Sequence, residues 1–192
     1  MRTLDHLVVA ARTLAEGVDW CEATLGVRPT AGGQHLFMGT RNRVFDVSSA
    51  AFPRSYLEIV AVDPSLPAPP QSRWFDLDDP ALQEQLARGP ALVHRVDRVD
   101  DIDAAHTALL ADGIDCGVVT QAERGALRWR ITLRADGRRA PTLIEWAGAH
   151  PTDAMSASGV QLDSLSDDYL PLSAVLITPR GRVTLAALPL KA

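Results

Sequence analysis

Two strand-like stretches, Leu4-Asp5-His6-Leu7-Val8-Val9 and Tyr56-Leu57-Glu58-Ile59-Val60, decide how this chain is expected to fold. The same two residue types return in Leu92-Val93-His94-Arg95-Val96 and in Thr142-Leu143-Ile144-Glu145-Trp146. Glu58 follows His6 by 52 positions and Glu145 follows His94 by 51, and the second pair lies 88 and 87 positions after the first. This interval indicates a duplicated module that carries one histidine and one glutamate in each copy.

Composition places the chain among ordinary globular proteins. Its 192 residues are 46% hydrophobic and 22% charged, which suffices for one compact domain or two small modules with a shared core. The formal net charge of −5 argues against a sequence-independent nucleic-acid binder, which needs a basic face. No apolar run approaches the ~18 residues of a membrane span, and the N-terminus has no signal-peptide core. Cys21 and Cys116, the only cysteines, favour a reducing cytoplasm.

Hydrophobic periodicity predicts a strand, a helix and three further strands in the first copy. Residues 4–10 are typical of a strand, and residues 13–25 carry apolar side chains at helical spacing. Thr13 and Glu16 form a capping-box pattern, and Gly26 stands where a helix C-terminal glycine belongs. Three strands are then predicted, separated by glycine and serine pairs, at residues 36–39, 43–48 and 55–62.

A proline-rich segment separates the two copies. Four prolines lie between residues 64 and 70, and Asp79-Pro80 begins a short helix that ends near Arg88. The second copy repeats the order of the first, with strands at 91–97, 115–121, 126–134 and 141–147 and a helix at 101–111. The predicted units are a first βαβββ module (1–63), a linker with a short helix (64–90), a second βαβββ module (91–150) and a C-terminal extension (151–192), which is strand-like at 160–165, 174–178 and 182–188.

The repeated histidines and glutamates suggest a metal site. Each is flanked by apolar residues on its strand face, and a buried carboxylate needs a partner because an unpaired buried charge is costly. One divalent ion bound by His6, Glu58, His94 and Glu145 would meet that need, and such mixed nitrogen and oxygen ligands suit Zn, Fe, Mn, Co or Ni. The alternative is that each histidine is a hydrogen-bonded core residue and each glutamate is solvated or paired with arginine. The strand that carries His94 can also be turned so that His94 faces solvent.

These motifs, with Leu25-Gly26-Val27-Arg28-Pro29 and Met38-Gly39-Thr40-Arg41-Asn42, resemble the vicinal-oxygen-chelate superfamily, which includes glyoxalase I and the extradiol dioxygenases. The closer resemblance is to bacterial glyoxalase-like domain proteins, and it covers about residues 3–150. It implies an α+β fold in which two tandem βαβββ modules form a cupped, mixed and mostly antiparallel sheet, here with a short β-rich C-terminal extension. It also implies metal ligands on the first and last strand of each module, and pairing of modules across a homodimer.

Five further residues are candidates for substrate binding. His35, Arg41 and Asn42 form a glycine-flanked polar cluster that can hold a carboxylate or carbonyl. Alternatively, Asn42 caps a turn and His35 packs at the rim. Arg128 and Arg130 share one face of their strand, where they can line an anionic substrate site or offset nearby acids on an outer face.

The expected function is that of a cytoplasmic, metal-dependent enzyme of lyase, isomerase or dioxygenase type. Its substrate would be a small oxygen-bearing molecule chelated by the divalent metal, and Glu58 or Glu145 would carry the proton as the catalytic group. The alternative is a metal-free protein of the same fold that binds or sequesters a small molecule. No nucleic-acid or membrane partner is expected.

Overall fold

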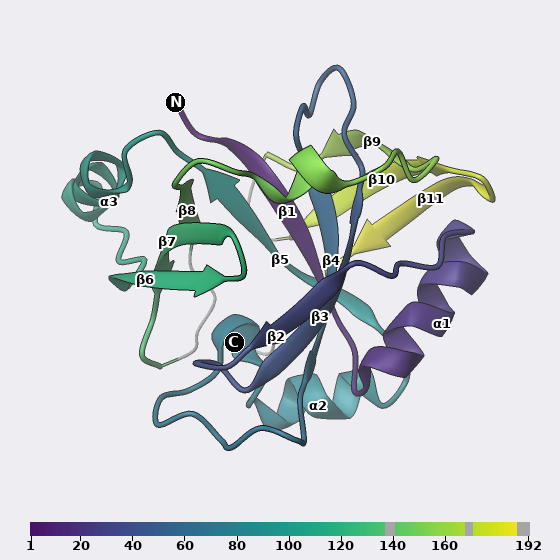
Figure 1. The fold of residues 1–192 in the computed structure, drawn as a ribbon, viewed down its shortest axis with the longest axis horizontal. Helices are drawn as coiled ribbons and strands as arrows, with labels where there is room; N and C mark the ends of the chain where they lie inside the picture. Colours follow the sequence, from purple (N-terminus) through teal and green to yellow (C-terminus); the bar gives the residue numbers. More distant parts are fainter. Residues whose placement is uncertain (137–140, 168–170, 188–192) are drawn as a thin grey trace.

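The computed structural model describes residues 1–136, 141–167 and 171–187, and within them the chain forms two sheets (Figure 1). The larger sheet has eight strands in the order β2-β3-β4-β1-β5-β8-β7-β6, and the smaller has three in the order β11-β10-β9. The first half supplies β1 (Thr3–Ala10), α1 (Leu14–Leu25), β2 (Gly32–His35), β3 (Thr40–Asp46) and β4 (Tyr56–Val62). The second half supplies β5 (Ala91–Arg98), α3 (Ile102–Ala111), β6 (Val118–Arg124), β7 (Leu127–Leu133) and β8 (Thr142–Trp146).

The segments outside the two copies are shorter. The linker holds the 3-10 helix η1 (Trp74–Asp76) and α2 (Pro80–Leu86), and a second 3-10 helix, η2 (Pro151–Ala154), follows β8. The extension forms the small sheet from β9 (Gln161–Leu165), β10 (Ser173–Thr178) and β11 (Gly181–Ala186). The α+β class, the two βαβββ copies and the mostly antiparallel sheet with a β-rich extension are therefore confirmed.

The two copies meet at the centre of the large sheet. β1 and β5 pair antiparallel, whereas β1 pairs with β4 and β5 pairs with β8 in parallel, so each half repeats the pattern of the other. The sheet curls until its two end strands, β2 and β6, contact each other. This curl creates an inner face, which carries His6, Val8 and Glu58, and an outer face, which carries Leu7 and Val9.

Each face has its own hydrophobic cluster. On the outer face, Leu7 and Val9 pack with α1 and with Leu162 and Leu176 of the small sheet. Figure 1 shows α1 beside β11 on that side and α3 at the opposite end of the molecule. On the inner face, Val8 belongs to a cluster that includes Trp74 and Phe75 of the linker and Trp129 of β7. The proline-rich linker therefore crosses the inner face and closes it with aromatic side chains.

Helix α1 follows the predicted pattern. Thr13 and Glu16 form the reciprocal capping box, and Gly26 ends the helix in the left-handed conformation at a φ of 76°. Gly17 lies directly on β4, because a Cβ added there would come within 2.3 Å of Ile59 Cγ2. The absence of a side chain at Gly17 thus sets how closely α1 approaches the sheet.

The strand predicted at 36–39 is wrong. Residues 36–39 form a turn, and the strand lies earlier, at Gly32–His35, opposite Thr40–Arg43. Gly32 adopts a φ of 148°, and a Cβ there would meet the carbonyl oxygen of Asn42 at 2.2 Å. In the sequence pattern this glycine pair indicates a break between strands, but in the structure it lets the backbones of β2 and β3 approach each other. Hydrophobic alternation therefore could not locate β2.

Other boundaries differ by one to three residues. The strand predicted at 115–121 lies at Val118–Arg124, and of the strand predicted at 182–188, residue 188 lies outside the described residues. Cys21 and Cys116 are both buried free thiols. Within the described ranges no helix has the length and apolar character needed to cross a membrane.

Candidate functional site

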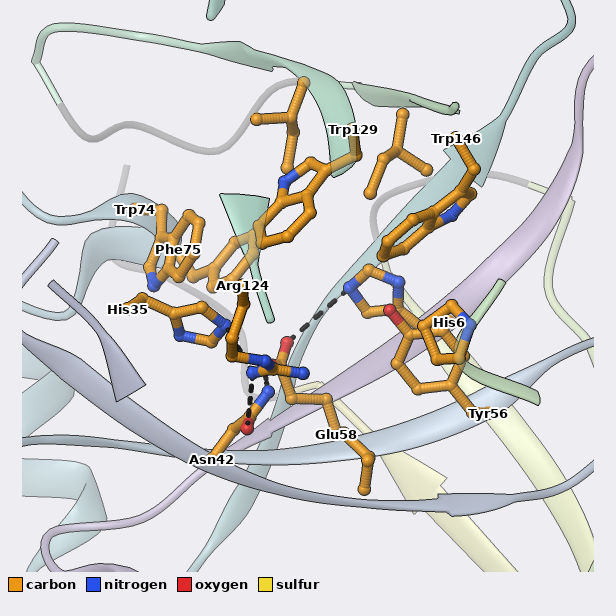
Figure 2. A pocket seen from close by; sticks show the side chains of 14 residues that line it. His6, His35, Asn42, Tyr56, Glu58, Trp74, Phe75, Arg124, Trp129 and Trp146 are labelled. Atoms are coloured by element: carbon orange, nitrogen blue, oxygen red, sulfur yellow. Dashed lines mark hydrogen bonds and ion pairs between the residues drawn. The ribbon is translucent and has the colours of Figure 1, made fainter. Parts of the chain in front are cut away.

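A cavity on the inner face gathers polar side chains from both halves (Figure 2). β1 and β4 run parallel with His6 opposite Tyr56, so Glu58, two residues further on, lies on the same face. Asn42 of β3 and His35 at the end of β2 complete the first half's contribution. Arg124, the last residue of β6, comes from the far end of the sheet and reaches the same cavity because the sheet curls.

His6 is held between two carboxylates. Its Nδ1 lies 2.7 Å from Asp5 Oδ1, and its Nε2 lies 3.5 Å from Glu58 Oε2. An ionised carboxylate only accepts hydrogen bonds, so Nδ1 carries the proton that Asp5 binds and Nε2 faces the cavity. Tyr56 stacks on the His6 ring at a centroid distance of 4.5 Å. The imidazole is thus fixed in position and in tautomer.

Asp5 is a fully buried anchor behind His6. His150 Nε2 donates to Asp5 Oδ2 at 2.9 Å and Trp146 Nε1 donates to the same oxygen at 3.0 Å, with Arg98 Nη1 at 3.4 Å. Burial alone would raise the pKa of Asp5, but the hydrogen bonds from His150 and His6 lower it well below its usual range. Asp5 therefore stays ionised and provides a permanent negative charge beside the imidazole.

A second chain of hydrogen bonds runs from Arg124 to Glu58. Arg124 Nη1 donates to Asn42 Oδ1 at 3.1 Å, and Asn42 Nδ2 donates to Glu58 Oε1 at 2.7 Å. The same Nη1 lies 3.2 Å from His35 Nε2, which must accept because a guanidinium only donates. Burial, with a further contribution from Arg124, lowers the pKa of His35 to about 4. His35 is therefore neutral at pH 7, and Arg124 keeps its full positive charge.

Aromatic side chains form the walls of the cavity. Trp74 and Phe75 stack on each other at 5.3 Å, and Trp129 and Trp146 meet at the same distance on the other side. The remaining apolar lining consists of Val44, Ile131, Ile144 and Pro151. Space for the centres of water molecules amounts to about 30 Å³, which is room for about two waters. The cavity is therefore narrow.

His94 lies on the inner face but outside the cavity lining. Its Nε2 lies 2.9 Å from Thr142 Oγ1, and its ring contacts Phe75 at 5.0 Å. Val96, two residues after His94, pairs with Thr142, just as Val8, two residues after His6, pairs with Glu58. Thr142 therefore occupies the position in the second half that Glu58 occupies in the first. The alternative that His94 faces solvent is excluded by its exposure of 4%.

Glu145 points away from the cavity. Successive side chains on a strand alternate, and Ile144 lines the cavity, so Glu145 lies on the opposite face. There its Oε2 accepts from the backbone N–H of Ile102 at 2.7 Å and from Arg130 Nη2 at 2.8 Å. Glu145 follows Thr142 by three positions, and this odd offset changes the face. The four predicted metal ligands are therefore not brought together.

Three predicted substrate-binding arginines also lie outside the cavity lining. Arg41 points to the other side of β3 from Asn42 and lies 4.0 Å from Asp63. Arg128 is half exposed and pairs with Glu123 at 3.3 Å. Arg130 pairs with Asp103 as well as with Glu145, beside α3. The structure places the other two candidates, His35 and Asn42, in the cavity.

The cavity does not fit a four-ligand metal site, although divalent metals are common in the vicinal-oxygen-chelate superfamily. Of the predicted ligands, only His6 Nε2 and Glu58 Oε2 face it. Arg124 is joined to Glu58 through the amide of Asn42, so a fixed positive charge opposes a second cation nearby. In the described part of the chain, no three His, Cys, Asp or Glu side chains gather in a way that could hold a metal ion.

Sequence reasoning missed three polar residues of this region: Asp5, Tyr56 and Arg124. Asp5 and Tyr56 lie inside the quoted motifs, and a buried acid next to a candidate site histidine was a usable signal. Arg124 gave none, because its role depends on the two ends of the sheet meeting. His150 reaches Asp5 from the turn after β8, across 145 positions of sequence.

The Glyoxalase-like domain family matches residues 4–178 of this chain. A variant of methylmalonyl-CoA epimerase from Streptomyces coelicolor, solved with 2-nitronate-propionyl-CoA, is 20% identical with a TM-score of 0.51, covering 78% of this chain and 99% of that chain. A hypothetical protein from Staphylococcus aureus is 13% identical with a TM-score of 0.58, covering 97% of this chain and 85% of that chain. Among curated proteins none matches. At these identities the solved structures support the fold alone.

Proposed function

This chain belongs to the glyoxalase-like domain family, and from that premise we propose that it is an enzyme that transfers a proton to or from a small oxygen-bearing substrate. The observation that carries the proposal is the His6–Glu58 pair, whose Nε2 and Oε2 atoms lie 3.5 Å apart at the wall of a buried cavity. This separation is longer than a direct hydrogen bond, and both atoms face the cavity, so a substrate atom that lies within hydrogen-bond reach of them can exchange a proton in general acid–base catalysis.

The surroundings give each group a distinct task. Asp5 holds the Nδ1–H of His6, so that Nε2 gives and takes the proton. Asn42 holds Glu58 Oε1, which leaves Oε2 directed toward His6 and the substrate. When a proton leaves a carbon next to a carbonyl, negative charge develops on the oxygen, and the Arg124 guanidinium stabilises it. The aromatic walls lower the dielectric constant beside these groups, which strengthens their interactions.

Proton exchange in D₂O provides the test. A panel of small 2-oxo and 2-hydroxy carboxylates and of short acyl thioesters is incubated with the protein, and loss of the C–H signal is followed by NMR. We expect exchange of at least one compound, retained in EDTA and lost in Glu58→Gln and in His6→Ala. Thr142→Val, at the corresponding position of the second half, serves as the control.

Two outcomes would contradict this proposal. Exchange that disappears in EDTA and returns with one equivalent of a divalent metal would point to metal-dependent chemistry, the first expectation from the sequence. Exchange that is equal in wild type and Glu58→Gln would remove the proposed base. Protein purified without chelator is therefore also analysed for bound metal.

A metal-free binding protein is the second candidate, favoured by the narrow aromatic cavity with its fixed cation. It predicts that a ligand binds tightly in EDTA, is released unchanged and binds Glu58→Gln as well as wild type. A homodimer and a cytoplasmic location also stay predictions. Sedimentation of the purified protein tests the first, and fractionation of the source cells tests the second.

A further inference from the structure

Arg124 has no acidic partner in the part of the chain that the structure describes. Among the described residues no carboxylate lies within 4.0 Å of its guanidinium, whereas Arg28, Arg130 and Arg182 on the surface each pair with an acid. Arg124 is partly buried at this cavity, where a positive charge without a nearby counter-ion is less well solvated than on the open surface. A ligand that brings a negative charge would compensate it.

Neutral residues hold Arg124 in place without cancelling its charge. Asn42 and His35, both buried, are its partners, and both contacts use Nη1. The Arg124 side chain also packs against Gly33, where an added Cβ would lie 2.9 Å from Arg124 Cδ. The Nε–H and Nη2–H groups have no protein partner in the described part of the chain. These two parallel donors are the edge that binds a carboxylate through both oxygens.

We propose that the ligand of this cavity is a short-chain monocarboxylate, and that Arg124 binds its carboxylate group. This inference rests on the proposed function and specifies its substrate class. One amide, that of Asn42, spans the distance between Arg124 and Glu58. The ligand therefore has few atoms between its carboxylate and the carbon that faces Glu58. The small volume of the cavity sets the same limit. A second carboxylate would meet Glu58, and like charges disfavour it.

The test compares an acid with its amide on the unmodified protein. Propionate and propionamide have nearly the same shape, and their binding is measured by isothermal titration calorimetry or by saturation-transfer NMR. We expect propionate to bind and propionamide to bind at least about tenfold more weakly, as for a lost charge-assisted pair. Succinate is expected to bind more weakly than propionate. Equal binding of acid and amide would overturn the inference.

Variants locate the effect. Arg124→Gln is expected to weaken propionate binding at least about tenfold, and Arg124→Lys less, since it keeps the charge but loses the paired donors. Arg128→Gln removes an exposed arginine outside the cavity and should leave binding unchanged. Propionate affinity that is the same in Arg124→Gln and wild type would place the anion elsewhere. Circular dichroism checks that each variant is folded, and the acid–amide comparison needs no variant.

The inference and the proposed function fail in different ways. Propionate binding that depends on Arg124, in a protein that exchanges no C–H proton, would keep the ligand class and reject the enzyme. Exchange of a neutral thioester that needs Glu58, in a protein that binds propionate no better than propionamide, would keep the enzyme and reject the carboxylate.

Discussion

The two halves of this protein have the same strand order but different chemistry at matching positions. In the first half, His6 faces Glu58 across a cavity and has the buried Asp5 behind it. In the second, His94 binds the neutral Thr142 and is covered by Phe75. The comparison shows that the two halves place different polar groups at matching positions of the inner face. The second half supplies Arg124, Trp129 and Trp146 to the cavity, and the linker supplies Trp74 and Phe75.

The largest expected effect is the difference in proton-exchange rate between a variant of Glu58 and a variant of its counterpart, Thr142. Glu58→Gln removes the proton acceptor but keeps the hydrogen-bonding shape, so proton exchange should fall about 100-fold or more. Thr142→Val removes the counterpart hydroxyl and should change the rate little. Exchange rates by NMR measure both. A larger loss in Thr142→Val than in Glu58→Gln would move the chemistry into the second half.

Asp5 and Val93 occupy the positions directly before His6 and His94. Replacing each one compares the contribution of a buried charge to stability with that of a buried apolar side chain. Asp5→Asn deprives His6, His150 and Arg98 of a shared acceptor, and should lower the free energy of unfolding by about 3 kcal/mol or more. Val93→Ala should cost about 2 kcal/mol by leaving a cavity. Urea unfolding at pH 7 measures both. A cost for Asp5→Asn below that of Val93→Ala would show that the Asp5 network is not needed for stability.

The lowered pKa of His35 predicts how the stability of the protein changes as the pH falls. Its pKa is about 4 in the folded protein because it is buried, against about 6.5 when unfolded. The unfolded chain therefore binds the proton first, and the stability that a neutral His35 provides above pH 6.5 is lost as pH falls toward 4. At pH 4.5 the loss is about 2 kcal/mol. His35→Gln should show a correspondingly smaller decrease between pH 7 and 4.5 in urea titrations. An unchanged decrease in His35→Gln would mean that His35 is already protonated or solvated.

The smallest expected effects compare how the two helices approach the sheet. Gly17 of α1 and Ala105 of α3 are separated by the same 88 positions as the two histidines. Gly17→Ala should destabilise by about 2 kcal/mol, because contact with Ile59 outweighs the helix propensity gained. Ala105→Gly should cost about 1 kcal/mol from propensity alone. A gain in thermal stability for Gly17→Ala would show that α1 can shift outward.

Local rules predicted most of the fold. The capping box at Thr13 and the glycine at Gly26 fixed the ends of α1, and alternation located the strands that hold His6 and Glu58. They did not locate β2, where glycines allow close backbone contact, a feature that hydrophobic patterns do not encode. The equal spacing paired a histidine with a glutamate in each half, but it did not take into account on which face of its strand each side chain lies. Glu145 follows His94 by 51 positions instead of 52 and lies on the outer face, whereas Thr142 occupies the position that corresponds to Glu58.

The remaining site residues depend on long-range closure. Nothing near Arg124 in the sequence distinguishes it from Arg128, which is exposed. Only the contact between β2 and β6 brings Arg124 to His35 and Asn42. Arg124 reaches the cavity only through the tertiary fold, so spacing along the sequence could not identify it as a site residue.

That closure also bears on solubility. The end strands of an open sheet present unpaired backbone groups to which other chains can add. Here the two ends of the sheet approach each other, and the Arg124 side chain lies across the gap between them. A variant that opens the curl would expose β2 and β6 together, and we expect it to self-associate before it loses its remaining structure.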